Sequence, residues 1–93
     1  MFDRVLRRLR ARIEASDYVV TTHADDEMDD EGLSVFDLES AVLNGTIVER
    51  QRDTKTQEQK YVVRGEGTDG SAVGVVAKYT VTGRAVIITV FRW

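Results

Sequence analysis

The spacing of hydrophobic residues changes at Thr46. Before this residue, apolar side chains recur every three or four positions, the spacing that gives a helix one buried stripe. After it, short segments rich in valine and isoleucine alternate with polar or glycine-containing stretches, a pattern typical of antiparallel strands. The chain is therefore predicted to be an α+β domain, with its helices first and its sheet second.

Three helices are predicted before Thr46. Residues 2–15 have an apolar stripe on one side and arginines on the other. Residues 18–22 are aromatic and β-branched and are predicted to form a short strand. A second helix follows, with Thr22 as its N-cap and Gly32 as its stop.

The third predicted helix begins at Ser34, because Asp37 three positions later completes a capping box. Asn44 and Gly45 end this helix. Its apolar residues are expected to form a buried stripe. They are Val35, Leu38, Ala41 and Val42.

Four strands are predicted after Thr46, at about residues 46–52, 60–64, 72–80 and 84–92. Asp69-Gly70 and Thr82-Gly83 are turn sequences, and strands joined by short turns pair antiparallel. We expect two or three N-terminal helices on one face of a four-stranded antiparallel sheet, with strand 18–22 at an edge. The other face of the sheet is left for a ligand or partner.

Length and composition limit the class of protein. The 93 residues suffice for a single domain over residues 1–93. No apolar run approaches the ~20 residues needed to span a bilayer, and arginines interrupt the start of the chain, so no membrane segment or secretory signal is predicted. The absence of cysteine excludes disulfides, thiolate metal sites and a cysteine nucleophile, and fits a reducing cytoplasm.

The net charge of −3 conceals an uneven distribution. Residues 1–13 contain five arginines and one aspartate, and residues 14–49 contain eleven acidic residues and no lysine or arginine. Residues 50–93 contain eight basic and four acidic residues. The basic segments are candidates for anion-binding surfaces, unless they neutralise the acidic segment within the fold.

His23 is the single histidine and is expected in the first turn of the second helix. The helix dipole disfavours a charged ring there, whereas the neighbouring carboxylates favour it. A histidine so placed can act as a general base or acid. It can equally be structural, with its ring hydrogen-bonded to the backbone between helix and sheet, and the sequence leaves both interpretations open.

The acidic run at residues 25–31 does not match a metal site. A calcium loop needs glycine at its sixth position, and a count from Asp25 reaches Asp30 there. A zinc site needs more than one histidine or some cysteine. We expect no metal and no cofactor, and interpret the run as a solvated acidic surface.

The basic residues after Thr46 lie on or beside the predicted strands. Alternation places Lys60 and Arg64 on one side of the sheet and Tyr61 on the other, and Lys78 is out of phase with Tyr79. Cations on one face would bind phosphates, and metal-free RNA cleavage needs such cations together with a base and an acid. The candidates are Lys60, Arg64, Lys78, Arg84 and Arg92. The alternative is that they are ordinary solvated side chains.

Tyr79 and Tyr61 are candidates for stacking on a nucleobase. They fit equally well as packing residues between neighbouring strands.

A series of short motifs resembles one known family. They are Tyr18 to Ala24 (YVVTTHA), Met28, Gly32-Leu33-Ser34, Gly45, Ile47 and the segment Ile88-Thr89-Val90-Phe91. In order and spacing they resemble small prokaryotic proteins classed as domain of unknown function 4258, over about residues 18–91. The basic helix at residues 2–15 lies outside the match.

Many members of that family resemble toxins of toxin–antitoxin pairs, with a layout similar to the RelE and MqsR ribonucleases, which cleave messenger RNA without metal. The resemblance implies a RelE/MqsR-like fold, an RNA substrate and an antitoxin partner. It also implies that His23 and Thr89 belong to a shared site. One departure stands out: the family usually has arginine where this chain has Glu27 and Glu31.

The leading hypothesis is a toxin-like, metal-independent endoribonuclease in the cytoplasm. His23 is its base or acid, and the basic residues of the sheet hold phosphates. The alternative is a non-catalytic module that holds a protein partner. A third interpretation is a homodimer that pairs edge strands.

Overall fold

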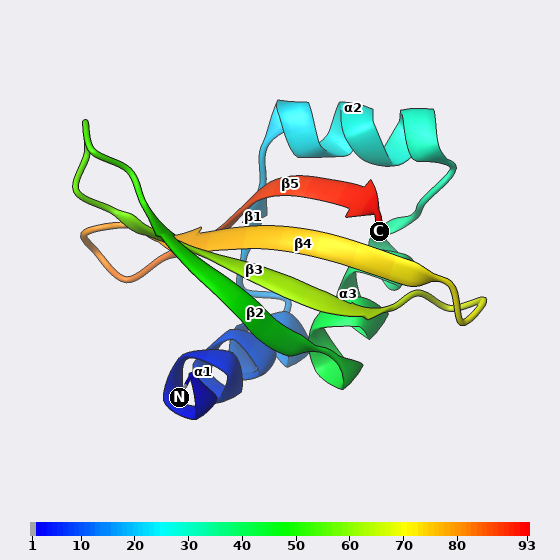
Figure 1. Ribbon diagram of the computed structural model, residues 1–93, viewed down its shortest axis with the longest axis horizontal. Coiled ribbons are helices and arrows are strands. Elements are labelled where there is room, and N and C mark those ends of the chain that lie inside the picture. The colour runs from blue at the N-terminus through cyan, green and yellow to red at the C-terminus, as the bar shows by residue number, and fades with distance from the viewer. Residues whose placement is uncertain (1) are drawn as a thin grey trace.

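A computed structural model describes residues 2–93. Three helices and five strands form two layers (Figure 1). The elements are α1 (Asp3–Glu14), β1 (Val19–Val20), α2 (Thr22–Glu31), α3 (Val35–Asn44), β2 (Thr46–Arg52), β3 (Gln59–Glu66), β4 (Ala72–Tyr79) and β5 (Ala85–Arg92). The predicted α+β class, with helices before the sheet, is confirmed. Every helix within residues 2–93 is too short or too polar to span a lipid bilayer.

The sheet has five strands in the order β1-β5-β4-β3-β2. Strands β2 to β5 form the predicted antiparallel meander. The prediction of a purely antiparallel sheet was wrong, because β1 pairs with β5 in parallel, Val19 beside Val86 and Val20 beside Ile87. A parallel pair needs a long connection, here everything from α2 to β4. The result is an open mixed sheet with β1 at one edge, where the short strand was expected.

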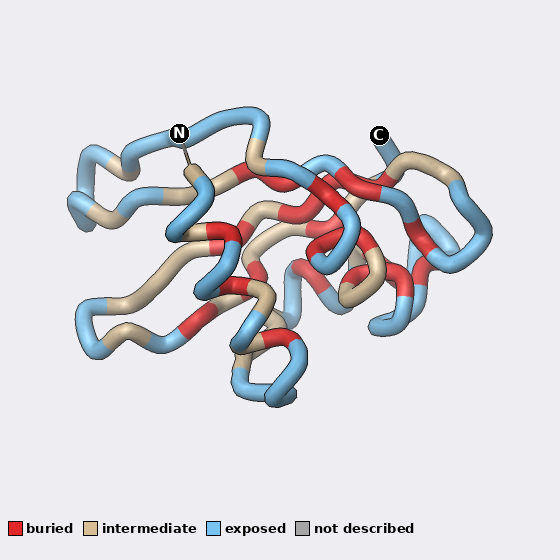
Figure 2. The backbone as a smooth tube through the Cα atoms, turned by 90° about the horizontal axis from the view of Figure 1, so that it is seen from below, coloured by how far each residue is buried: buried red, intermediate tan, exposed pale blue. Residues whose placement is uncertain are grey.

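Helices α1 and α3 cover one face of the sheet, and α2 lies alongside β5 (Figure 1). Figure 2 shows the buried residues gathered where the helices meet the strands. The core joins apolar residues of every helix to the inward side of β3, β4 and β5. Its largest fully buried side chains are Leu9, Leu38, Ile87, Val42, Val63, Val73, Val75 and Val90. The side of the sheet away from α1 and α3 is called the open face below.

Two details of the helix predictions need correction. The N-cap of α2 is Thr21, one residue before the expected Thr22, because the Thr21 hydroxyl accepts a hydrogen bond from the Ala24 amide. Val35 is 40% exposed rather than buried, since α3 turns only Leu38, Ala41 and Val42 into the core. Gly32 ends α2 as expected, in the left-handed conformation with φ of 68°.

Asp37 connects the start of α3 to the turn between β3 and β4. One carboxylate oxygen accepts hydrogen bonds from the Ser34 amide and hydroxyl, at 2.9 and 3.2 Å, which forms the predicted capping box. The other accepts from the amide and hydroxyl of Thr68, at 2.8 and 2.7 Å. These hydrogen bonds, that of the Thr68 hydroxyl first, lower the pKa of Asp37 to about 2.

We expect Asp37 to make the stability of the protein depend on pH. Its pKa is lower in the folded chain than its ordinary value of 3.8, so its contribution is complete above pH ~5 and is lost as the pH falls toward 2. Asp37→Asn should lower the free energy of unfolding at pH 7 by about 2 kcal/mol, because hydrogen bonds to a charged acceptor are lost. Urea unfolding at pH 7, 4 and 2.5 tests this. A difference between wild type and variant that persists unchanged at pH 2.5 would contradict it.

Candidate functional site

The open face carries three of the predicted cations in two rows across the strands. Lys60 on β3 stands beside Lys78 on β4. Four residues further along β3, Arg64 stands beside Gly74 of β4, which in turn pairs with Phe91 of β5. The predicted alternation is confirmed here, because Lys60, Arg64 and Lys78 share a face while the neighbouring residues of each strand point to the helices.

The two lysines of the open face are held by carboxylates of the loop between β2 and β3. Nζ of Lys78 lies 3.1 Å from Oε1 of Glu58, and Nζ of Lys60 lies 3.6 Å from Oδ2 of Asp53. Two anionic groups therefore already occupy the positions where phosphates would bind. Any polyanion that binds this face must compete with them or move the loop.

Arg64 has different surroundings, because within residues 2–93 it forms no ion pair. Its guanidinium carbon lies 5.0 Å from the ring centre of Trp93. The Trp93 ring is itself stacked on Phe91, with ring centres 5.6 Å apart and an interplanar angle of 25°. Gly74 makes room for Phe91, since a Cβ there would lie 2.3 Å from the ring. The result is a cation on two stacked aromatic rings, with Trp93 half exposed.

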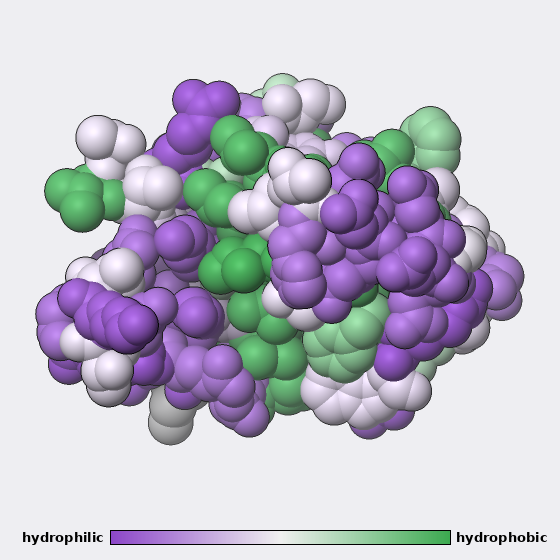
Figure 3. All heavy atoms as spheres, turned by 90° about the horizontal axis from the view of Figure 1, so that it is seen from above, coloured by the Kyte–Doolittle hydropathy of each residue, from purple (hydrophilic) through white to green (hydrophobic). Residues whose placement is uncertain are grey.

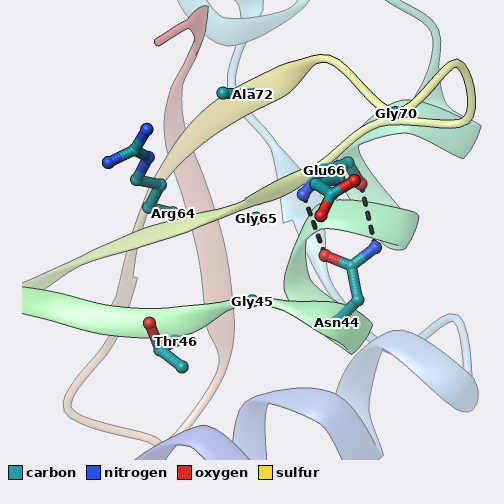
Figure 4. A pocket seen from close by; sticks show the side chains of 8 residues that line it. All are labelled: Asn44, Gly45, Thr46, Arg64, Gly65, Glu66, Gly70 and Ala72. Atoms are coloured by element: carbon teal, nitrogen blue, oxygen red, sulfur yellow. Dashed lines mark hydrogen bonds between the residues drawn. The ribbon is translucent and has the colours of Figure 1, made fainter.

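A pocket of about 430 Å³ opens beside Arg64. Figure 4 shows Arg64 on one side of it, Glu66 on another and Thr46 at the lower rim. Gly45 and Thr46 at the start of β2 and Gly65 at the end of β3 also line it, and Gly70 and Ala72 complete the wall. The pocket thus has a carboxylate on one side and the Arg64 side chain on the other, with the Arg64 guanidinium directed toward β5 and Trp93 (Figure 4).

His23 lies in the first turn of α2, with its side chain 71% exposed. Its Nε2 atom is 3.4 Å from Oε1 of Glu27, one turn later on the same helix. The same oxygen of Glu27 accepts a hydrogen bond from the backbone amide of Val90, at 3.3 Å. The ring is therefore not sealed between helix and sheet, as the structural interpretation of His23 required. It is an accessible imidazole beside a carboxylate that β5 holds.

The direction of the His23 side chain follows from the residues that α2 uses to pack. Ala24 faces the core, and Glu27 reaches the outer edge of β5. Going round the helix from Ala24, Glu27 comes after about 60° and His23 after about 100° in the same direction. His23 therefore points past the edge of β5 toward the side of the open face. Thr89 is on that face of β5, opposite Val76 of β4.

The structure places three of the sequence-predicted residues away from the open face. Tyr79 lies on the side of the helices, its hydroxyl 3.5 Å from the Val5 carbonyl and its ring under the Arg8 guanidinium, and burial raises its pKa. These are the contacts of a packing residue, and stacking of Tyr79 on a base stays a prediction. Tyr61 also lies on this side, with its ring edge-on to Phe2. Arg92 reaches along the edge of β5 to the Glu31 carbonyl and the Ser71 hydroxyl.

Arg84 is exposed just before β5, and its amide donates to the Thr80 hydroxyl. Among residues 2–93, Arg84 forms no ion pair with a residue of the open face. Of the predicted site residues, Lys60, Arg64, Lys78 and Thr89 therefore share the open face, and His23 borders it.

The comparison with family models matches residues 20–92 to the family described as domain of unknown function (DUF4258). The chain belongs to this family. The matched part of this DUF4258 protein includes His23, the whole meander and the open face, and leaves out α1. No curated protein and no solved structure matches the chain.

Glu27 and Glu31, where the family resemblance led us to expect arginine, both make local contacts in this DUF4258 chain. Glu27 neutralises no cation of the open face; its carboxylate instead caps an outer amide of β5 and stands beside His23. Glu31 contributes its backbone carbonyl, which accepts from Arg92. The two positions thus fasten α2 to β5.

The surface around His23 is mixed in character. Figure 3 looks down on α2 and shows its hydrophilic side chains next to a strip of hydrophobic ones. Partly exposed apolar residues at this edge of the sheet include Val86 and Ile88 of β5. A ligand at His23 therefore meets apolar surface on one side and carboxylates on the other. The nearest cations of the open face lie across β5, on β4 and β3.

Sequence reasoning missed Glu27, Glu66, Phe91 and Trp93 as parts of the site. The i, i+4 spacing of His23 and Glu27 was visible in the sequence. A second signal is a glycine opposite an aromatic residue on a neighbouring strand, here Gly74 opposite Phe91. It can be recognised only when the register of β4 against β5 is known. Trp93 follows the last strand and carried no signal of its own.

Proposed function

We propose that this protein is a metal-independent endoribonuclease of the toxin type. The observation that carries the proposal is the pairing of His23 with Glu27: an exposed imidazole whose partner carboxylate is held by the Val90 amide. A base oriented by a third group is a recurring arrangement in catalysis. Its position at the border of a face that carries Lys60, Arg64 and Lys78 supports RNA as the substrate.

In the proposed reaction the imidazole of His23 takes the proton of a ribose 2′-hydroxyl. The 2′-oxygen then bonds to the adjacent phosphorus while the bond from phosphorus to the 5′-oxygen breaks. The leaving oxygen takes a proton from water, which reaches the exposed site. The products are a 2′,3′-cyclic phosphate and a 5′-hydroxyl. Glu27 keeps the ring in place and stabilises its charged form.

The cations of the open face bind the flanking phosphates in this proposal. Strands of a sheet are about 4.8 Å apart, so Lys60 and Arg64 on β3 lie roughly 10 Å from β5. An RNA strand that crosses the sheet therefore reaches both the imidazole and these cations. Asp53 and Glu58 leave the two lysines when phosphates bind.

A second candidate is a non-catalytic module that binds a protein such as an antitoxin. The outer side of α3 favours it, because Phe36 is 67% exposed there and Leu43, two turns later, is 41% exposed. An antitoxin-like protein encoded beside this chain that binds wild type but not Phe36→Ser, with no RNA cleaved, would favour this module. Edge pairing through β2 would appear as a dimer in light scattering.

Incubation of the purified protein with end-labelled single-stranded RNA in the presence of EDTA tests the proposed function. We expect cleavage to fragments that end in a 2′,3′-cyclic phosphate, because the reaction needs only a base and cations. The matched control is the same sequence with 2′-O-methyl groups, which lacks the attacking hydroxyl and should stay intact. An absence of cleavage, cleavage of the 2′-O-methyl strand, or loss of activity in EDTA would each reject the proposal.

A further inference from the structure

We propose that the pocket between Arg64 and Glu66 binds one guanine base of a single-stranded RNA and so sets sequence preference. The inference deepens the proposed function and rests on it for the choice of RNA as the ligand. The pocket lies on the open face at the far end of β3 from the lysine pair. Its volume of about 430 Å³ is in the range of small-ligand sites.

The wall that carries Glu66 is held rigidly by the end of α3. The Asn44 amide oxygen accepts from the Glu66 backbone amide at 2.8 Å, and the Asn44 amide nitrogen donates to the Glu66 carbonyl at 3.0 Å (Figure 4). The Ser40 hydroxyl donates to the same carbonyl at 2.9 Å. With its backbone groups satisfied in this way, Glu66 presents only its carboxylate to the pocket. A preformed wall loses little conformational freedom when a ligand binds.

The carboxylate of Glu66 selects for a base with two adjacent N–H donors. A carboxylate only accepts hydrogen bonds, and guanine offers N1–H and the 2-amino group side by side on its Watson–Crick edge. Adenine and cytosine each have an unprotonated ring nitrogen beside the amino group, and uracil has a single ring N–H between two carbonyls, so each of the three leaves one carboxylate oxygen facing an acceptor. Among the four bases, guanine therefore matches Glu66 best.

Arg64 supplies the second half of the site. Planar guanidinium groups stack on nucleobases, and this one lies at the margin of the pocket, with its central carbon 5.0 Å from the centre of the Trp93 ring. Its charge also attracts the phosphate of the bound nucleotide. Because Arg64 forms no ion pair within residues 2–93, no internal partner has to be displaced. Glu66 thus gives specificity and Arg64 gives affinity.

Binding can be followed through Trp93, the single tryptophan of the chain. The probes are 2′-O-methyl RNA pentamers of sequence UUGUU, UUIUU, UUAUU and UUUUU (I is inosine), which bind without being cleaved. We expect UUGUU to change the fluorescence of Trp93 and to bind about tenfold more tightly than UUAUU or UUUUU, the usual scale for one bidentate base contact. UUIUU should fall between, because inosine keeps N1–H and lacks the 2-amino group.

Two variants separate the roles of the pocket residues. Glu66→Gln should remove the preference for UUGUU and leave the other pentamers unchanged or slightly tighter. Arg64→Ala should weaken all four by a similar factor. The matched controls are Glu49→Gln, an exposed carboxylate of β2 outside the pocket, and Arg4→Ala, an exposed arginine of α1. Both should bind like wild type.

The outcomes distinguish a failure of the guanine-pocket proposal from a failure of the ribonuclease proposal. Equal binding of all pentamers, or a preference for UUGUU that survives Glu66→Gln, would reject guanine recognition even if RNA is cleaved. A preference lost in Glu66→Gln and retained in His23→Gln supports the pocket even if no cleavage is found, because binding does not need the imidazole.

Discussion

Replacing His23 by glutamine is expected to slow RNA cleavage by a factor of at least about 100, because general acid–base groups typically contribute 10²–10⁴-fold. Glutamine can still form hydrogen bonds at this position but cannot take up a proton near neutral pH. The exposed side chain contributes little to the core, so the variant should unfold at the same temperature as wild type. Single-turnover cleavage of end-labelled RNA, together with thermal unfolding, measures both effects.

The partner residue sharpens this test. Glu27→Gln keeps an oxygen that can accept from the Val90 amide but removes the negative charge beside the ring. Since Glu27 acts through His23, we expect a fall in kcat with little change in KM. Asp26→Asn is the matched control, because Asp26 is exposed, adjacent in sequence and absent from the contacts of His23. It removes the same charge and should cleave RNA like wild type.

Full activity of His23→Gln would remove the base from the mechanism and leave the open face as a binding surface only. Equal losses in Glu27→Gln and Asp26→Asn would attribute the effect to the overall charge of α2. Both results are measurable on folded protein, since none of the three substitutions touches the core.

The elements of this fold were largely predictable because each one depends on neighbouring residues. Ser34 with Asp37 marks the start of α3 and Gly32 the end of α2, and both signals lie within a few positions of the boundaries that they set. The alternation of Lys60, Tyr61 and Arg64 likewise gives the two faces of β3 without knowledge of the rest of the sheet.

The parallel pairing of β1 was not predictable in the same way. Val19 and Val20 are only two residues, and their spacing is the same whether they pair parallel or antiparallel. What decides the direction is that α2 returns along β5, with the Thr21 amide on the Ile87 carbonyl and Glu27 on the Val90 amide. These contacts join residues more than 60 positions apart, so no local pattern contains them.

The candidate site was predicted only in part, because some of its contacts also join residues that are far apart in the sequence. Residue type pointed to His23, Lys60, Arg64 and Lys78, and strand alternation grouped the last three. The exposure of His23 depends on which side of α2 packs against β5, and the position of Trp93 over Arg64 depends on the register of three strands. Tyr79 and Arg92 had suitable chemistry, but the fold turns them to the helices and to the edge.

Among substitutions that add one methyl group to the sheet, Gly65→Ala is expected to cause the largest loss of stability. A Cβ at residue 65 would lie 2.0 Å from the carbonyl oxygen of Ala41 and 2.7 Å from its carbonyl carbon. The clash is with the backbone of α3, so no change of a side-chain rotamer relieves it, and α3 must move away from β3. Overpacking of a core typically costs 1–3 kcal/mol, and we expect about 3 kcal/mol here.

The loss should appear as a fall of roughly 12–24 °C in the unfolding temperature, since 1 kcal/mol corresponds to about 4–8 °C in a domain of this size. Gly32→Ala is the matched control: its Cβ would make an ordinary van der Waals contact, 3.9 Å from a guanidinium nitrogen of Arg92, and only its φ of 68° opposes alanine. That substitution should cost about 1 kcal/mol. Equal losses in the two variants would mean that α3 and β3 are not in such close contact.

The same contact links stability to the candidate RNA site. Gly45 also faces the Ala41 carbonyl, where a Cβ would lie 2.4 Å away, so two glycines allow the last turn of α3 to sit directly on β2 and β3. Only at this distance does the Asn44 side chain reach both backbone groups of Glu66. We therefore expect Gly65→Ala, measured below its unfolding temperature, to lose the preference for UUGUU while still cleaving RNA at His23. A preference that survives the displacement of α3 would show that Asn44 does not set the position of Glu66.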